Sequence, residues 1–115
     1  MGEEKYTQKT MAALQSAQQA AAMRYHQEIT SAHVLLALVQ EPEGLLGTIF
    51  EECRTDLPML KAKLEQLLKK IPSVKGQDRL SMGMDMVRVL GRADDFAKSM
   101  KDDYISTEHL LLGLA

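Results

Sequence analysis

Three histidines and one cysteine are the side chains of this sequence best suited to metal binding or nucleophilic chemistry: His26, His33, His109 and Cys53. A zinc site needs several converging ligands at short, characteristic spacings, and these four residues do not reproduce such a pattern. No base is placed near Cys53 by the sequence, and a buried or half-buried free cysteine usually behaves as a small hydrophobe. We therefore predict no metal site, no catalytic residue and no enzyme.

His33 and His109 each stand four residues after an isoleucine, within a short apolar segment. A general base or a ligand is one interpretation of a repeated histidine. The other is a ring that hydrogen-bonds the loop before its helix, since imidazole both donates and accepts. We favour the second interpretation.

Composition limits the class of protein. The 115 residues are 45% hydrophobic, enough for one modest core, and only 4% aromatic, with no Trp. A net charge of −2 without long charged blocks lacks the basic footprint of a nucleic-acid-binding protein. No apolar run approaches the roughly 18 residues that span a membrane. A single cysteine and an acidic, polar beginning fit a cytoplasmic protein.

Helical periodicity predicts an all-α fold. We expect helices over about residues 8–24, 31–40, 45–50, 57–70 and 81–101, with a sixth beginning near Ser106. Thr7 and Asp56 stand where N-caps would satisfy first-turn amides, and Pro58 fits a first helical turn. The second helix is apolar on nearly all faces, so it should be central. Residues 71–78 contain Pro and Gly without helical period and form the long connection.

The sequence repeats itself at an offset of 76 residues without a gap. This shift places Leu14 on Leu90, Ala21 on Ala97, Ile29 on Ile105 and His33 on His109. A long helix, a short loop and a capped apolar helix therefore occur twice, which predicts a tandem duplication of a helical unit with an approximate two-fold axis.

One domain covers residues 1–115, with a first repeat over about 7–70, a linker over about 71–80 and a partial second repeat over about 81–115. The second repeat is expected to be truncated and to leave apolar surface on its last helix. We expect Leu36 and Leu112 near the core, with Leu35 and Leu111. Either a dimer of the fragment buries the remaining leucines, or the last helix frays; we favour the dimer.

The two copies of Ile-(Ser/Thr)-(Ser/Thr)-X-His-(Val/Leu)-Leu-Leu-(Ala/Gly)-Leu, at residues 29–38 and 105–114, resemble the paired N-terminal repeats of Clp/heat-shock ATPases. Residues 71–76 and 85–90 resemble the ClpB branch, the disaggregases, whereas residues 104–109 also resemble ClpC. The resemblance implies a domain on a hexameric ATPase ring that captures unfolded or aggregated polypeptides. No phosphate-binding G-x-x-x-x-G-K-[ST] motif is present, so ATP and Mg²⁺ would belong to other domains of the parent protein.

In ClpB relatives a client-binding surface is attributed to a Thr early in the first helix and to an Asp and a Glu around the second motif. The matching residues are Thr7, Asp102 and Glu108. Thr7 and Glu108 can equally be helix-start residues that satisfy free amides. Phe96, between the linker and Asp102, adds apolar area. The exposed carboxylates should matter little for folding.

Two hypotheses follow from the resemblance. The first is a module that binds unfolded clients weakly and releases them to the ring. The second is an adaptor-docking domain of a ClpC- or ClpA-type unfoldase, which receives a folded partner or a phosphorylated side chain. Phosphate recognition requires clustered arginines, and the five arginines of this sequence are scattered, which favours the first hypothesis. Met82, Met84 and Met86 suit either adaptable recognition or core filling.

Overall fold

The structure is a computed structural model that describes residues 5–40, 44–75 and 80–115. Its helices are α1 (Gln8–Met23), α2 (Ser31–Gln40), α3 (Gly44–Glu52), α4 (Leu57–Lys69), α5 (Met84–Ser99) and α6 (Thr107–Leu114). Two strands of two residues, β1 (Glu28–Ile29) and β2 (Ser81–Met82), complete the described elements. The predicted all-α fold is confirmed. The helix break expected at residues 41–43 and part of the linker lie outside the described residues.

Side-chain caps fix the starts of α1 and α4. The Thr7 hydroxyl accepts a hydrogen bond from the Thr10 amide at 3.2 Å, and Asp56 accepts one from the Met59 amide at 3.1 Å. Pro58 lies in the first turn of α4, where its missing N–H removes no helical hydrogen bond. The predicted caps are confirmed, and each satisfies an amide that the helix itself leaves free.

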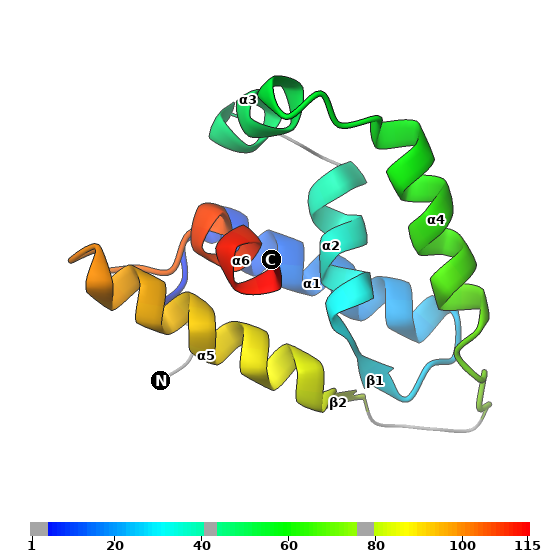
Figure 1. Ribbon diagram of the computed structural model, residues 1–115. Coiled ribbons are helices and arrows are strands. Elements are labelled where there is room, and N and C mark those ends of the chain that lie inside the picture. Colours follow the sequence, from blue (N-terminus) through cyan, green and yellow to red (C-terminus); the bar gives the residue numbers. More distant parts are fainter. Residues whose placement is uncertain (1–4, 41–43, 76–79) are drawn as a thin grey trace.

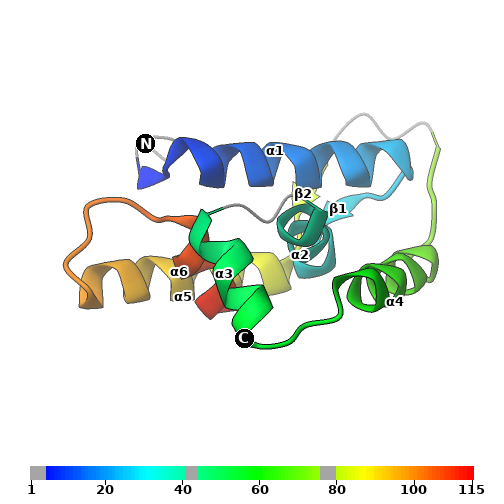
Figure 2. The same ribbon diagram turned by 90° about the horizontal axis from the view of Figure 1, so that it is seen from above.

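The duplication is confirmed by the helices. Both ends of α5 lie 76 residues after the ends of α1. In Figures 1 and 2, α1 and α5 form two outer layers that run in opposite directions, with α2 and α6 between them. The helix ends repeat as well: Tyr25 and Lys101 have positive φ angles of 57° and 60°, and the residues after them donate to Ala21 and Ala97.

The short strands connect the two repeats. β1 pairs in parallel with β2, so that Ile29 lies opposite Met82, and the duplicated contact is a parallel bridge between Tyr6 and Ile105. The segment before α5 therefore pairs with the segment before α2, and the segment before α1 pairs with the segment before α6. Each pairing joins one repeat to the other. This pairing corrects the predicted start of the fifth helix, because Ser81 and Met82 are extended and the helix begins at Met84.

The core lies between the layers and contains Leu36, Leu68, Met86 and Leu110, each at most 1% exposed. The central position of α2 is confirmed, since six of its ten residues are buried. One side-chain expectation is wrong, because Leu112 is 40% exposed rather than near the core. Cys53, directly after α3, is exposed.

The cluster of three methionines divides between core and surface. Met86 is fully buried on the inner face of α5, where it fills the core. Met82 and Met84 are 38% and 67% exposed. Met86 therefore follows the core-filling interpretation, while the other two present thioethers at the surface.

Candidate functional site

The predicted client-binding residues gather at one end of the molecule. There the start of α1 lies beside the start of α6, and the loop after α5 leads into α6 (Figure 1). The parallel bridge holds these segments together: the Thr7 amide donates to the Ile105 carbonyl at 3.1 Å, and the Ile105 amide donates to the Lys5 carbonyl at 2.6 Å. Segments nearly 100 residues apart in the sequence thus become neighbours through their main chains.

Thr7 serves as a helix cap at this end. Its hydroxyl is 2.8 Å from the hydroxyl of Thr10, which is fully buried, and accepts from the Thr10 amide. The Thr7 side chain itself is partly exposed. The helix-start interpretation of Thr7 is therefore supported by its contacts, and its hydroxyl reaches the surface only at the edge of the site.

Asp102 is held by a buried histidine. The His109 Nδ1 atom accepts a hydrogen bond from the Ser106 amide at 2.9 Å, so the ring proton lies on Nε2. Nε2 then donates to Asp102 Oδ2, also at 2.9 Å. The Asp102 side chain is 51% exposed and the His109 side chain is 5% exposed. One carboxylate oxygen is thus fixed in position while the group still faces solvent.

Glu108 lies in the first turn of α6. Its carboxylate accepts hydrogen bonds from Thr107 Oγ1 at 3.0 Å and from Ser106 Oγ at 3.4 Å. The favourable end of the helix dipole adds to the stability of an acidic group here. Glu108 and Asp102 both connect to Ser106, Asp102 through His109, so the two carboxylates flank one loop.

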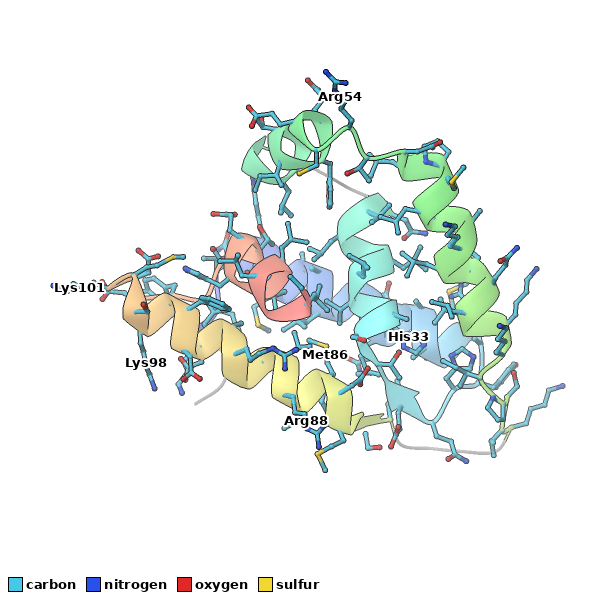
Figure 3. The ribbon with its side chains drawn as sticks, in the orientation of Figure 1. His33, Arg54, Met86, Arg88, Lys98 and Lys101 are labelled. Atoms are coloured by element: carbon cyan, nitrogen blue, oxygen red, sulfur yellow. The ribbon has the colours of Figure 1, made fainter. Side chains whose placement is uncertain are left out.

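Phe96 lies on α5 and is 36% exposed. Met100 follows it by four residues, hence on the same helix face, and Tyr104 lies in the loop toward α6; these two are 51% and 55% exposed. We call Phe96, Met100 and Tyr104 the α5-end patch. Lys98 and Lys101 project outward from the same end of the helix (Figure 3). The site therefore combines apolar area with charges of both signs.

A small cavity of about 90 Å³ is lined by Lys9 near the start of α1 and by Thr107 at the start of α6. Its lining is mostly small or apolar and comes from α1, α2, α3 and α6: Lys9, Ala12, Ala13, Ser16, Ala37, Leu38, Leu46 and Thr107. An apolar cavity of about 150 Å³ accommodates benzene, so this one has room for a short aliphatic group. Sequence reasoning missed this cavity, because it depends on how four helices meet.

Electrostatics at the bridge involve Tyr6, which precedes Thr7. Burial raises the pKa of the Tyr6 hydroxyl, and the charge of Asp94 raises that pKa further. Tyr6 therefore stays neutral at ordinary pH and contributes packing rather than charge.

His109 is the site residue whose role sequence reasoning only half identified. The loop contact was predicted and is confirmed for both His33 and His109, each of which accepts from the amide three residues before it. The second contact, to Asp102, was missed. Its signal was present in the repeat: the offset of 76 places His26 on Asp102, and His26 makes the matching contact to His33 at 2.8 Å.

Among the described residues, no group of three or more His, Cys, Asp or Glu is arranged to hold a metal ion. Within the same part of the chain, no helix is both long enough and apolar enough to cross a membrane. Every buried side-chain nitrogen or oxygen that the structure describes has a hydrogen-bond partner. This end of the molecule presents carboxylates and exposed apolar side chains.

Comparison with known proteins agrees with this arrangement. The chain is 41% identical over 113 residues to the chaperone protein ClpB of Bacillus cereus and 34% identical over 112 residues to that of Rhodopirellula baltica. These matches cover 95% and 97% of the chain but only 13% of each relative, so the chain spans about an eighth of their length.

Solved structures show the same fold. The N-terminal domain of Hsp104 from Candida albicans superposes with a TM-score of 0.86 at 24% identity, covering 96% of this chain and 73% of that one. The N-terminal domain of the ClpV1 ATPase from Escherichia coli gives a TM-score of 0.87 at 25% identity, covering 96% and 67%. The model of the Clp repeat N-terminal domain matches residues 5–115. From the duplicated helix pairs, the paired loop histidines and these matches, we conclude that the chain belongs to the Clp repeat N-terminal domain family.

Proposed function

We propose that this domain binds exposed segments of unfolded or aggregated polypeptides and passes them to the ATPase ring of a ClpB-type disaggregase. The binding surface is the end of the molecule formed by Thr7, Phe96, Asp102 and Glu108. The observation that carries the proposal is the occurrence there of the half-exposed Asp102 carboxylate, the partly exposed Glu108, the α5-end patch and a small apolar cavity. The relatives named ClpB are chaperones, in accord with this role.

The chemistry of the surface suits an unfolded client. An exposed segment offers apolar side chains for the patch and the cavity, and unpaired main-chain amides and basic side chains for the carboxylates. Because the apolar area is small and the polar groups remain solvated, we expect micromolar affinity, worth about 8 kcal/mol. Weak binding allows release toward the ring.

The rest of the proposed machine lies in the parent protein. ATP and Mg²⁺ would be held by its ATPase domains, which would assemble as a hexamer in the cytoplasm. In this proposal the domain described here has no catalytic residue and no cofactor, and contributes binding only.

Adaptor docking is the second candidate function. Its phosphate-binding form requires a cluster of free arginines. Arg24 is paired with Glu65 at 2.7 Å, and Arg92 donates to the Gly113 carbonyl at 2.6 and 2.9 Å. Arg54, in the turn after α3, and Arg88, on α5, lie far apart (Figure 3). Phosphate recognition by described arginines is therefore poorly supported, while docking of a folded adaptor stays open to test.

The proposal is tested by fluorescence anisotropy with a labelled, permanently unfolded protein and, separately, with the same protein in its folded form. Glu108→Gln removes the charge but keeps the shape. We expect it to weaken binding of the unfolded protein about tenfold, since a charge-assisted hydrogen bond contributes about 1.5 kcal/mol or more.

The matched control is Glu52→Gln, which changes an exposed glutamate at the end of α3. It should bind as the wild type does. Equal affinity of all three proteins for the unfolded client would contradict the proposed surface. Tighter binding of the folded form would favour adaptor docking instead.

A further inference from the structure

His26 and His33 form a buried pair in the first repeat, away from the proposed client-binding end. Their residues are 4% and 0% exposed, and the ring centroids are 5.1 Å apart with an interplanar angle of 64°. His26 Nδ1 lies 2.8 Å from His33 Nε2. Figure 3 shows His33 at the start of α2, on the side of that helix toward α4.

The hydrogen bonds of the pair fix where its protons lie. The Thr30 amide donates to His33 Nδ1 at 2.9 Å, so His33 is neutral with its proton on Nε2. That proton is donated to His26 Nδ1. His26 lines the same surface hollow as Leu68 and Lys69 of α4. The hydrogen-bonded pair therefore joins the start of α2 to the segment after α1 at the place where that segment meets α4.

An additional proton on either histidine disrupts the hydrogen bonds of the pair. On His26 Nδ1 it would place two N–H groups against each other across 2.8 Å. On His33 Nδ1 it would oppose the Thr30 amide and leave only the Thr30 hydroxyl, also 2.9 Å away, as acceptor. At either position at least one buried hydrogen bond is lost, and unmade buried hydrogen bonds are costly.

The charged groups around the pair come from three helices. Arg24 at the end of α1 and Asp85 at the start of α5 act on it electrostatically. Glu65 and Lys69 of α4 line the same surface hollow as His26, and Glu65 is paired with Arg24. The net surroundings do not favour a buried cation.

The pKa values follow from this environment. Burial lowers the pKa of His33 to about 4, assisted by the charges of His26 and Arg24 and opposed by Asp85. The pKa of His26 is lowered by burial and then by Arg24, while the Leu68 main chain acts in the opposite direction. An exposed histidine in the opened state has a pKa of about 6.5 and is protonated below that pH. In the folded pair the lowered pKa values oppose this protonation.

The second repeat provides an internal comparison. At the position equivalent to His26 it has Asp102, whose carboxylate accepts from His109 Nε2 at 2.9 Å. A carboxylate still accepts from a histidine N–H when that histidine takes up a proton. The second repeat therefore lacks one of the two protonation positions that break the first repeat's pair, the acceptor nitrogen of His26, whereas Nδ1 of His109, like that of His33, already accepts from a main-chain amide.

We propose that the His26–His33 pair is an acid-sensitive clasp that holds α4 against α2, and that uptake of one proton opens it. Among the described elements, α4 packs mainly on α2, through Leu64 and Leu68, so it can detach without disrupting α5 and α6. Opening would expose the apolar faces of both helices. The device is local to the first repeat.

The test is amide hydrogen exchange of α4 and α5 at several pH values between 7 and 4.5, corrected for the intrinsic pH dependence of exchange. In the wild type, we expect the opening constant of α4 to rise as pH falls below about 6.5, by up to tenfold per pH unit for one proton. The amides of α5 should change much less over the same range.

His26→Asp transfers the second repeat's pair into the first repeat. Asp102 reaches His109 from the equivalent backbone position, so Asp at residue 26 should reach His33. We expect the acid-induced opening of α4 to be clearly weaker in this variant, because the substitution removes the protonation of His26 Nδ1 and leaves only that of His33 Nδ1. A wild-type slope retained in His26→Asp, equal loss of protection in α4 and α5, or no pH dependence in the wild type would each overturn the proposal.

A second measurement does not depend on the variant. Imidazole ¹⁵N shifts of the wild type at pH 7 should show both His26 and His33 neutral and protonated on Nε2, with His33 taking up its proton only near the pH at which α4 opens. A charged His33 at pH 6 with α4 still protected would equally overturn the clasp.

Discussion

Asp102 provides the sharpest test of how the second repeat holds its carboxylate. In Asp102→Ala, the buried His109 Nε2 loses the acceptor that now lies 2.9 Å away. Leaving a buried donor unpaired costs about 1–3 kcal/mol. Since the Asp102 side chain is 51% exposed, water reaches part of the vacated space and the lower half of that range applies. For a domain of 115 residues we expect the melting temperature to fall by roughly 4–8 °C.

The matched variant is Asp102→His, which places in the second repeat the residue found at the equivalent position of the first. His26 accepts from its partner at 2.8 Å, so this variant should keep most of the wild-type melting temperature near pH 7.5. Differential scanning calorimetry of the three proteins measures the effect. Equal melting temperatures for Asp102→Ala and the wild type would refute the structural role of this hydrogen bond and restore the view that Asp102 is expendable for folding.

Four further predictions follow from single contacts. Glu108→Gln should change the melting temperature by only about 2 °C or less, because its partners are two hydroxyls. Gly113→Ala should destabilise by about 1–3 kcal/mol in urea unfolding, since a Cβ would lie 2.7 Å from the Val89 carbonyl oxygen, whereas Gly91→Ala, in open space, should stabilise by about 0.5–1 kcal/mol. The free energy of unfolding should decrease as pH falls from 6.5 toward about 4, because the unfolded chain takes up the proton that buried His33 resists; a flat urea-unfolding profile there would contradict this. If the exposed Leu112 mediates dimerisation, sedimentation should show a concentration-dependent dimer that Leu112→Ser abolishes, while a monomer at all concentrations would exclude it.

The repeat carried most of what could be predicted about the fold. Helix periodicity and an offset of 76 residues were enough to predict the paired helices, their loops and the roles of His33 and His109 at the loops. These features depend on local hydrogen bonds and on residues close in sequence. Interactions between residues close in sequence produce regular patterns, and these can be predicted from the sequence alone.

The remaining features depend on tertiary packing. The extended conformation of Ser81 and Met82 is set by pairing with β1, which lies more than 50 residues earlier. The exposure of Leu112 depends on which faces of α6 meet other helices, and the amphipathic pattern of a short, very apolar helix does not distinguish them. The small cavity is lined by residues of α1, α2, α3 and α6, so no single segment of the sequence predicts it.

The candidate site was partly accessible from the sequence. Resemblance proposed Thr7, Asp102 and Glu108 as site residues, and the bridge between Tyr6 and Ile105 explains why residues so distant in sequence share one end of the molecule. The dual role of Asp102, as a solvent-facing carboxylate and as the partner of His109, emerges only from the distances. Stability and binding must therefore be measured together for this residue.

The central claim, that unfolded clients bind at the end formed by Thr7, Phe96, Asp102 and Glu108, is tested most directly by chemical-shift mapping. The ¹⁵N-labelled domain is titrated with an unlabelled, permanently unfolded protein. We predict that the largest amide shifts cluster at the start of α1 and over residues 96–109, with the amides lining the adjacent cavity also affected. Shifts concentrated on α3 and α4, with this end of the molecule unchanged, would contradict the claim.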